Sequence, residues 1–324
     1  MLENKIFKIS NEKEFKTLAL EVFKFQFENN KVYKQFCNLL NRNPENVDRL
    51  DQIPFLPIEF FKSKKIITGN SPSQIIFSSS GTTGSVTSKH QVTDLRLYEN
   101  SFLNAFELFY GSPENYTFLA LLPSYLERTG SSLIYMVDSL IKRSKDKNSG
   151  FYLDNLDELS NKLGELDKSG KKVFLIGVSF ALLDLVEKKQ FDLKNTIIME
   201  TGGMKGRRKE MIREELHNNL KQGFGIEHIH SEYGMTELLS QAYSKSYGDF
   251  DCPPWMKILI RDPEDALSFL PNGKTGGINV IDLANINSCS FIATQDLGRQ
   301  KNDQIEILGR FDNSDVRGCN LLLL

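Results

Sequence analysis

The sequence lacks a long hydrophobic run and a strong charge of either sign. Its longest apolar stretch, residues 173–186, is interrupted by Asp184 and is too short to cross a bilayer. The first residues include no apolar segment of the kind found in signal peptides, so we expect a cytoplasmic protein without a membrane span. Because 40 basic residues nearly balance 42 acidic ones, the charge indicates neither a nucleic-acid partner nor a membrane surface.

Cysteine and histidine are also scarce, with four of each in a chain of 324 residues. The cysteines form no Cys-x-x-Cys pair, which argues against a zinc site and against a disulfide framework, and buried free thiols are expected by default. His228 and His230 lie on one face of an expected strand as a metal-binding pair would, but no third ligand has a suitable spacing. The cysteines are Cys37, Cys252, Cys289 and Cys319.

A Walker-type P-loop is missing as well, although one loop has the composition of a phosphate site. An apolar stretch at 75–77 runs into hydroxyl residues and glycines, and a lysine follows five residues after the last glycine. Glycines let the backbone approach an anion closely, and consecutive amides and hydroxyls can surround phosphate oxygens. We therefore predict a phosphate loop; the alternative is a flexible polar linker. Its residues are Ser80, Gly81, Thr82, Thr83, Gly84 and Lys89.

Apolar segments with the length of buried strands alternate with helical patterns through the middle of the chain. This alternation is typical of an α/β fold with a largely parallel sheet. Apolar residues at helical spacing predict helices over 11–40, and short strands after Gly225 indicate a second sheet or a small barrel. The expected strands are 116–122, 173–178, 195–201, 226–230, 256–260, 278–282, 291–294 and 304–308.

Two segments that follow expected strands have the composition of a ligand site. Gly202, Gly203 and Met204 come after an apolar strand, where a flat ligand can lie against bare backbone, although a tight turn would use the same glycines. The second segment has an aromatic ring that can stack on a base, and hydroxyl and carboxylate oxygens that suit phosphate and Mg²⁺. It comprises Glu232, Tyr233, Gly234, Met235, Thr236 and Glu237.

In this order, the segments resemble the motifs of the adenylate-forming superfamily, which includes acyl-CoA synthetases, luciferases and peptide-synthetase adenylation domains. Ser-Ser-Gly-Thr-Thr-Gly with its lysine is similar to the phosphate loop, and Tyr-Gly-Met-Thr-Glu is similar to the adenine and metal segment. The resemblance implies that Thr236 lies toward phosphate and Glu237 toward Mg²⁺. ATP and Mg²⁺ are the cofactors that it implies.

Two further motifs extend the resemblance. Thr-Gln-Asp at 294–296 resembles a Thr-Gly-Asp segment whose aspartate, here Asp296, binds both ribose hydroxyls; Gln295 replaces the usual glycine. A carboxylate suits this role because it accepts two hydrogen bonds at once. Gly-Arg-Phe-Asp at 309–312 resembles the Gly-Arg-x-Asp hinge, which implies that Arg310 lies toward the nucleotide.

The end of the chain resembles one subfamily, the acyl-protein synthetases typified by LuxE. In the superfamily a lid domain with a catalytic lysine follows the hinge, whereas this sequence and that subfamily end shortly after it. Pro-Phe-Leu-Pro at 54–57, Thr-Gly-Gly-x-Lys-Gly at 201–206 and Asp-Val-Arg-Gly-Cys at 315–319 look like that subfamily, and the resemblance covers residues 53–324.

The resemblance implies an α/β fold with the superfamily's large-domain architecture and without the C-terminal lid. That architecture has stacked sheets flanked by helices and a smaller β region. We expect a single domain over 1–324, with a helical lead at 1–70, a core at 71–310 and an acceptor tail at 311–324.

The resemblance also implies that Cys319 takes the acyl group from acyl-AMP and passes it to a partner protein, a reductase or an acyltransferase. A thiol has a pKa of about 8.5 and is a strong nucleophile once ionised, and Arg317 nearby would lower that pKa. The alternative is an unreactive thiol at the end of the chain. Without a lid lysine, Lys205 is expected to neutralise charge at the α-phosphate, and Lys89 is the competing residue.

Three functions remain open from the sequence. The first is ATP-dependent activation of a carboxylic acid, with a fatty acid favoured, followed by transfer to Cys319. The second is an adenylating ligase that passes the acyl group to CoA or to a carrier protein. The third is a nucleotide-binding subunit without catalysis, and the presence of Glu237 and Asp296 argues against it.

Overall fold

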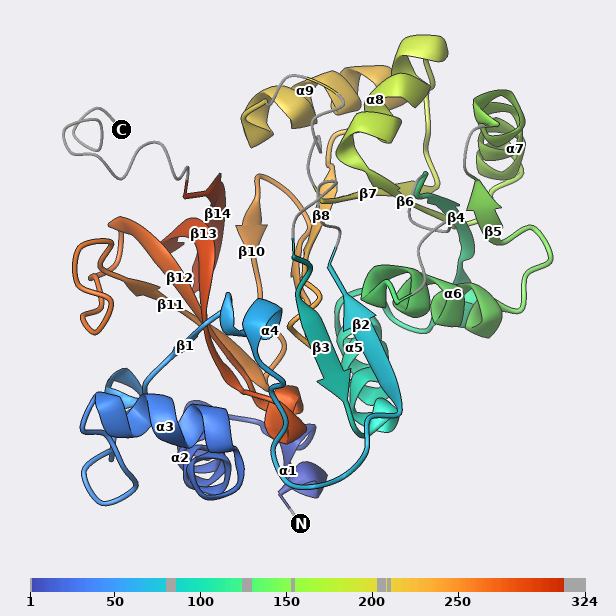
Figure 1. The fold of residues 1–324 in the computed structure, drawn as a ribbon. Coiled ribbons are helices and arrows are strands. Elements are labelled where there is room, and N and C mark those ends of the chain that lie inside the picture. Colours follow the sequence, from blue (N-terminus) through green and yellow to red (C-terminus); the bar gives the residue numbers. More distant parts are fainter. Residues whose placement is uncertain are drawn as a thin grey trace. The chain divides into compact units, whose positions relative to one another are not determined.

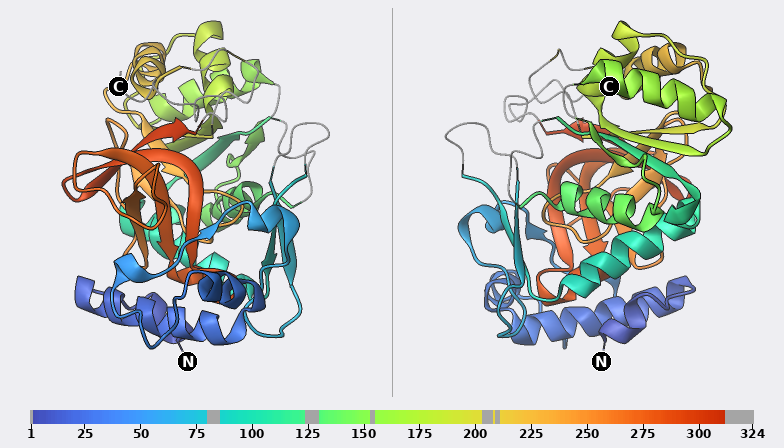
Figure 2. Two further views of the ribbon diagram at one scale, coloured as in Figure 1. Left: turned by 60° about the vertical axis from the view of Figure 1, so that its left-hand side comes forward. Right: turned by 90° about the vertical axis from the view of Figure 1, so that its right-hand side faces the viewer.

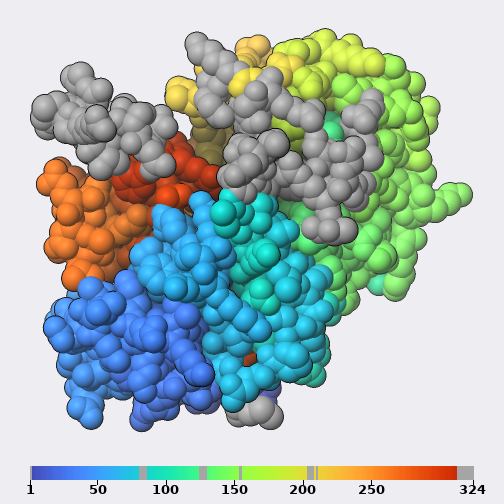
Figure 3. Space-filling view, in the orientation of Figure 1, coloured from blue at the N-terminus to red at the C-terminus, as the bar shows by residue number. Residues whose placement is uncertain are grey.

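The computed structural model describes residues 2–79, 86–123, 130–152, 155–202, 208 and 211–311, which carry colour in Figure 3. Contacts between residues divide the chain into two compact units, drawn in Figure 1. The first unit combines Met1–Gly69 with Pro254–Leu324, and the second is Asn70–Pro253. The single domain that the family resemblance implies over 1–324, with a helical lead, a core and an acceptor tail, stays a prediction.

Two helices near the start of the first unit confirm the helical pattern of residues 11–40. Helix α2 (Glu12–Asn29) begins where the Asn11 side chain accepts a hydrogen bond from the Glu14 amide at 3.0 Å. Asn30 ends α2 and caps α3 (Lys31–Leu39) by accepting from the Tyr33 amide. Each such cap stabilises its helix by about 1 kcal/mol. The shorter helical elements are α1 (Glu3–Ile6), η1 (Leu50–Gln52), α4 (Phe60–Ser63) and η3 (Leu283–Asn287).

An antiparallel sheet forms much of the first unit and confirms the second sheet expected from the short strands. Four of its strands follow the order β14-β13-β12-β11, and β1 pairs parallel to β13. Phe291 on β13 packs against Phe23, Tyr33 and Phe55, so the N-terminal segment and the sheet share a core. The strands are β1 (Leu56–Pro57), β11 (Met256–Arg261), β12 (Thr275–Asp282), β13 (Phe291–Lys301) and β14 (Gln304–Arg310).

Gln26 of α2 is buried and ties this helix to the turn before β13. Its amide nitrogen donates to the carbonyl oxygens of Asn285 at 3.0 Å and Ile286 at 2.9 Å. Its amide oxygen accepts from the Ser290 amide at 2.9 Å. Because buried polar groups need hydrogen-bond partners, these three bonds fix how the helix lies on the turn.

The second unit is built on a largely parallel sheet, as the alternating pattern predicts. Its strand order is β5-β4-β6-β7-β8-β9; β9 runs antiparallel to β8, and the other pairs are parallel. β4 and β6 are buried at every position, as is typical of parallel strands covered on both faces. The strands are β4 (Thr117–Leu121), β5 (Gly150–Tyr152), β6 (Val173–Val178), β7 (Thr196–Thr201), β8 (His230–Tyr233) and β9 (Ala242–Ser244).

The prediction of a strand at 226–230 was wrong in its position and its sheet. The strand there, β8, begins at His230 and belongs to the parallel sheet. Its extent follows from pairing with β7, in which Met199 lies opposite His230 and Thr201 opposite Glu232. Such pairing depends on residues distant in the sequence, so local composition placed the strand too early.

Helices cover both faces of the parallel sheet (Figures 1 and 2). α5 and α6 lie on one face, and α7, α8 and α9 lie on the other. The ring of Phe106 on α5 lies 5.5 Å from that of Phe118 and 5.3 Å from that of Phe174. Gly223 allows α9 to approach α8, because a Cβ there would lie 2.3 Å from the Cβ of Val186. The helices are α5 (Leu95–Tyr110), α6 (Ser132–Ser144), α7 (Leu156–Lys168), α8 (Ser179–Lys188) and α9 (Arg213–Phe224).

The remaining elements of the second unit are short. β2 (Ile75–Ser78) and β3 (Lys89–Val92) form an antiparallel pair, and β10 (Asp249–Phe250) and η2 (Pro113–Asn115) complete the unit. In the part of the chain that the structure describes, no helix has the length and apolar character needed to cross a membrane.

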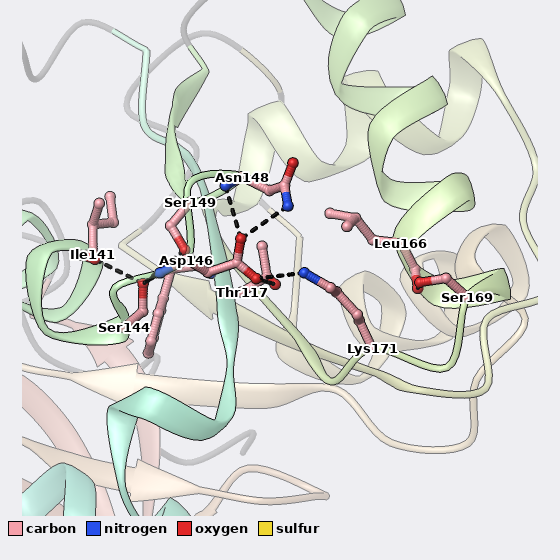
Figure 4. Close-up of polar contacts among 10 residues, drawn as sticks. Thr117, Ile141, Ser144, Asp146, Asn148, Ser149, Leu166, Ser169 and Lys171 are labelled. Carbon is pink, nitrogen blue, oxygen red and sulfur yellow. Dashed lines mark hydrogen bonds and ion pairs between the residues drawn. The ribbon is translucent and has the colours of Figure 1, made fainter.

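Asp146 anchors the loop between α6 and β5 (Figure 4). Its carboxylate accepts from the Thr117 hydroxyl at 2.7 Å, and from the Lys171 ammonium and the Asn148 amide at 2.8 Å each. Burial opposes ionisation, but these donors outweigh it and lower the pKa of Asp146. Since Thr117 begins β4, the contacts hold the loop and the edge strand β5 beside the rest of the sheet.

Candidate active site

Two of the predicted ligand segments meet at the carboxyl ends of β7 and β8. β7 ends at Thr201 and continues into Gly202, whose φ of 70° favours glycine. β8 ends at Tyr233, and Glu232 lies opposite Thr201 in the pairing of the two strands. Parallel sheets bind ligands at this edge. The structure therefore brings the start of the glycine turn next to the segment 232–237.

Glu232 is held at this edge by a hydrogen bond. The Thr201 hydroxyl donates to Glu232 Oε2 at 2.5 Å. Burial raises the pKa of Glu232 to about 7; the Thr201 bond opposes this change, and the charge of Glu200 adds to it. Glu232 is therefore partly protonated near neutral pH, where it can both donate and accept hydrogen bonds. Gly234 leaves room for it, because a Cβ there would lie 2.4 Å from Glu232 Oε1.

The turn after β8 presents the residues predicted to bind phosphate and Mg²⁺. The Leu238 amide donates to the Met235 carbonyl at 3.1 Å, and Thr236 and Glu237 lie between them. Glu237 is buried and Thr236 is half-buried. A carboxylate beside a hydroxyl suits Mg²⁺, which proteins commonly hold with one or two carboxylates together with substrate phosphates and water.

His228 and His230 resemble a metal-binding pair only in their spacing along the sequence. Within them, no group of three or more His, Cys, Asp or Glu side chains could hold a metal ion. His230 instead lies 3.2 Å from the Tyr110 hydroxyl, and burial lowers the pKa of His230 to about 4.

The predicted phosphate loop lies in the sequence between strands β2 and β3. Ser79 and Ser88 close its base, because the Ser88 amide donates to the Ser79 hydroxyl at 2.9 Å and the Ser79 amide donates to the Ser88 carbonyl at 3.1 Å. Lys89 begins β3 and is exposed. The predicted site residues outside the described ranges are Ser80, Gly81, Thr82, Thr83, Gly84, Gly203, Met204, Lys205 and Cys319.

A buried polar network that the sequence did not indicate lies next to Gly202. Glu200 Oε1 accepts from Arg213 Nη1 at 2.7 Å, and His217 Nε2 lies 3.6 Å from the same oxygen. The Ser179 hydroxyl donates to the Gly202 carbonyl at 2.9 Å and lies 3.2 Å from Glu200 Oε2. Burial opposes ionisation of Glu200, but the nearby His217 ring and the charge of Arg213 lower its pKa. The available signal was a glutamate in a strand that contains no other charged residue.

In the first unit, the structure brings Asp296 and Arg310 together. They are partners in the pairing of β13 with β14, and Arg310 Nε lies 3.3 Å from Asp296 Oδ1. Asp296 is buried, whereas the Arg310 side chain is 80% exposed. Gln295, which replaces the glycine of the superfamily motif, directs its amide to Glu59.

Arg261 is another residue that the sequence did not single out. Its guanidinium donates to the Thr294 carbonyl at 2.7 Å and lies 5.6 Å from the centre of the Phe311 ring. Gly277 leaves space for it, because a Cβ there would lie 2.4 Å from Arg261 Cζ. Arg261 thus supports the strand just before Asp296, but an arginine at the end of an alternating strand gives no sequence signal for this role.

Comparison with known proteins indicates the family. The model of the LuxE acyl-protein synthetase family matches residues 127–324. The long-chain-fatty-acid–luciferin-component ligase of Aliivibrio fischeri is 22% identical over 339 residues, which cover 94% of this chain and 86% of the relative.

Solved structures show the fold. A 2-hydroxyisobutyryl-CoA ligase in an open conformation with 2-HIB-AMP and CoA has a TM-score of 0.69 at 13% identity, over 94% of this chain and 72% of that one. ATP-bound MatB from Rhodopseudomonas palustris has a TM-score of 0.53 at 19% identity, over 72% of this chain and 47% of MatB. The expected α/β class and its likeness to adenylate-forming ligases are therefore confirmed. Because the family model matches more than half of the sequence, the chain belongs to the LuxE acyl-protein synthetase family of adenylate-forming ligases.

Proposed function

We propose that the protein uses ATP and Mg²⁺ to activate a fatty acid as acyl-AMP, transfers the acyl group to Cys319, and delivers it to a partner protein. The family is described as acyl-protein synthetases, and the relative from A. fischeri is named as a long-chain-fatty-acid ligase. One observation on this chain carries the proposal: Gly202 and the segment 232–237 meet at the carboxyl ends of adjacent parallel strands, where such sheets bind ligands.

In the first step, a carboxylate oxygen of the acid attacks the α-phosphorus of ATP. A bond forms between that oxygen and phosphorus, and the bond from phosphorus to pyrophosphate breaks. Tyr233 stacks on the adenine, Asp296 accepts from the ribose hydroxyls, and Thr236 donates to phosphate. The backbone and hydroxyls of 80–84 surround the phosphates. The other residues proposed to line the nucleotide are Gly202, Gly203, Met204, Glu232, Gly234 and Met235.

Positive charge must stabilise the negative charge that develops at the α-phosphate. Arg310 is exposed and suited to this role, and we assign the second cation to Lys205 or Lys89. When Mg²⁺ is bound, it offsets the charge of the phosphates, and Glu237 is the side chain proposed to hold it.

In the second step, the Cys319 thiolate attacks the carbonyl carbon of acyl-AMP. A carbon–sulfur bond forms, the bond from carbon to the phosphate oxygen breaks, and AMP leaves. Two other thiols are poorly suited, because burial raises the pKa of Cys37 to about 12 and also raises that of Cys289. A thiol is a nucleophile only when it is ionised. Cys252 is half-buried and provides the comparison for Cys319.

Exchange of labelled pyrophosphate into ATP tests the first step. The protein should catalyse exchange only when a carboxylic acid and Mg²⁺ are both present. Glu237→Gln keeps the size of the side chain and removes its charge, so exchange should fall at least roughly tenfold, or by about 1.4 kcal/mol. Glu227→Gln, at a side chain that is 93% exposed, is the matched control and should leave exchange unchanged.

Two results would contradict the proposal and select one of its rivals. ATP binding without acid-dependent exchange would indicate a nucleotide-binding subunit without catalysis. Exchange without any acylated protein would indicate a ligase that passes the acyl group to CoA or to a carrier protein.

A further inference from the structure

His90 of β3 is buried and lies against the turn proposed to bind phosphate and Mg²⁺. Its Nδ1 atom is 2.9 Å from the carbonyl oxygen of Thr236, which is 146 residues further along the chain. Lys89 directly precedes His90, and Glu237 directly follows Thr236. One hydrogen bond therefore joins the strand that leaves the predicted phosphate loop to the turn that carries the predicted metal ligand.

The chemistry of the two partners determines where the proton lies. A carbonyl oxygen can only accept, so Nδ1 of His90 carries the hydrogen and donates it. Burial lowers the pKa of His90 to about 4, although the hydrogen bond to the Thr236 carbonyl acts in the opposite direction. The imidazole is thus neutral near neutral pH, and its contribution is geometric.

The strand that carries His90 is firmly held. His90 lies opposite Phe77 in the pairing of β2 with β3. Phe77 is fully buried, with its ring 5.2 Å from that of Tyr98 on α5 and 6.0 Å from that of Tyr135 on α6. The His90 ring therefore occupies a position that is set by the core of the second unit.

The turn is also tethered on either side of Thr236. Before it, Glu232 accepts from the Thr201 hydroxyl on β7. After it, the Ser240 hydroxyl lies 2.9 Å from the Ser101 hydroxyl on α5. These contacts fix the two ends of the segment, and the bond from His90 acts between them, at the peptide that joins Thr236 to Glu237.

We propose that His90 is a positioning residue for the bound nucleotide. It holds the Thr236 peptide so that the Thr236 hydroxyl and the Glu237 carboxylate face the phosphates of the bound nucleotide. This inference rests on the proposed function and adds the residue that holds Thr236 and Glu237 in place for the nucleotide.

Substitutions at His90 can separate the hydrogen bond from the volume of the ring. His90→Asn keeps a donor, because the amide nitrogen of asparagine is bonded to Cγ as Nδ1 is in histidine. His90→Leu keeps a side chain of similar size without a donor, and His90→Gln moves the donor one bond further out if the leucine variant does not fold. His228→Leu, at a histidine that is 49% exposed, is the control.

Each variant is titrated with ATP in the presence of Mg²⁺ by calorimetry and is then assayed for pyrophosphate exchange. His90→Leu and His90→Gln should raise the Kd and the KM for ATP roughly tenfold and change kcat by less than about threefold. His90→Asn and the control should stay within about threefold of the unsubstituted protein in Kd and KM.

Unchanged Kd and KM in His90→Leu would overturn the inference, even if thermal stability falls. Equal losses in His90→Asn and His90→Leu would overturn it as well, because the volume of the ring rather than its donor would then matter. If the protein binds ATP but does not exchange pyrophosphate, the proposed activity is overturned. The role of His90 is still tested in that case, because the Kd for ATP can be compared between the variants. A protein that does not bind ATP would overturn both.

Discussion

The ion pair between Arg213 and Glu200 supports the turn at Gly202. The substitution Arg213→Met tests how much this ion pair contributes to the free energy of unfolding. The Glu200 side chain is 6% exposed, the Arg213 side chain is 29% exposed, and their closest atoms are 2.7 Å apart. Removing one partner of a buried ion pair leaves an uncompensated charge and costs about 3–5 kcal/mol. Because Arg213 is partly exposed, and because Ser179 and His217 still face Glu200, we expect a loss of about 3 kcal/mol in the free energy of unfolding.

The pH dependence of this loss identifies Glu200 as its source. The pKa of Glu200 is lowered in the fold, so its ionised form contributes stability above its ordinary pKa, and that contribution disappears as the pH falls through the folded-state value. Removing Arg213 removes one of the causes that lower the pKa of Glu200, so that pKa rises in the fold and protonation at lower pH relieves the buried charge. The difference between the unsubstituted protein and Arg213→Met should therefore shrink between neutral pH and about pH 5.

Urea unfolding measures the effect. Far-ultraviolet circular dichroism follows the whole chain, whereas the fluorescence of Trp255, the one tryptophan, reports on the first unit. Arg143→Met, at an exposed arginine of α6, is the matched control and should change stability by less than about 0.5 kcal/mol. A loss below about 1 kcal/mol for Arg213→Met, or a loss that is the same at both pH values, would refute the reasoning.

Two further substitutions test polar contacts that stabilise each unit. Asp146→Asn should cost about 1–2 kcal/mol at neutral pH, since it removes the charge that accepts from Lys171. The pKa of Asp146 is lowered in the fold, so this contribution is present above its ordinary pKa and is lost as the pH falls through the folded-state value; urea unfolding at about pH 3 should show a smaller difference, and an unchanged one would argue against it. Gln26→Leu leaves the buried carbonyl of Asn285 without this donor and should cost about 2 kcal/mol, measured by Trp255 fluorescence; a loss below about 0.5 kcal/mol would be inconsistent with the described contacts.

Local patterns predicted several elements of the second unit because their causes are local. The apolar run at 173–178 coincides with β6, and the run expected at 116–122 contains β4. An aspartate directly before a helical pattern is a typical N-cap, and Asp94 accepts from the Arg96 amide at the start of α5. Where an element's limits depend on a distant partner, as for β8 with β7, the prediction was displaced.

The contacts within the site could not be read from composition. His90 and Thr236 are 146 residues apart, and a single histidine in a short polar strand gives no sign of its partner. The proximity of Asp296 and Arg310 depends on a shift in register after Leu297, which no local sequence pattern predicts. Motifs therefore supplied the candidate residues, while the topology of the sheets determines which of the described ones meet.

A thioester on Cys319 is the central claim, and intact mass measures it most directly. The protein is incubated with ATP, Mg²⁺ and a long-chain fatty acid, and Cys319→Ala and Cys252→Ala are treated in parallel. The account predicts a mass increase of one acyl group that hydroxylamine removes, that Cys252→Ala retains and that Cys319→Ala lacks. An adduct that persists in Cys319→Ala, or pyrophosphate release with no adduct on any form of the protein, would contradict it.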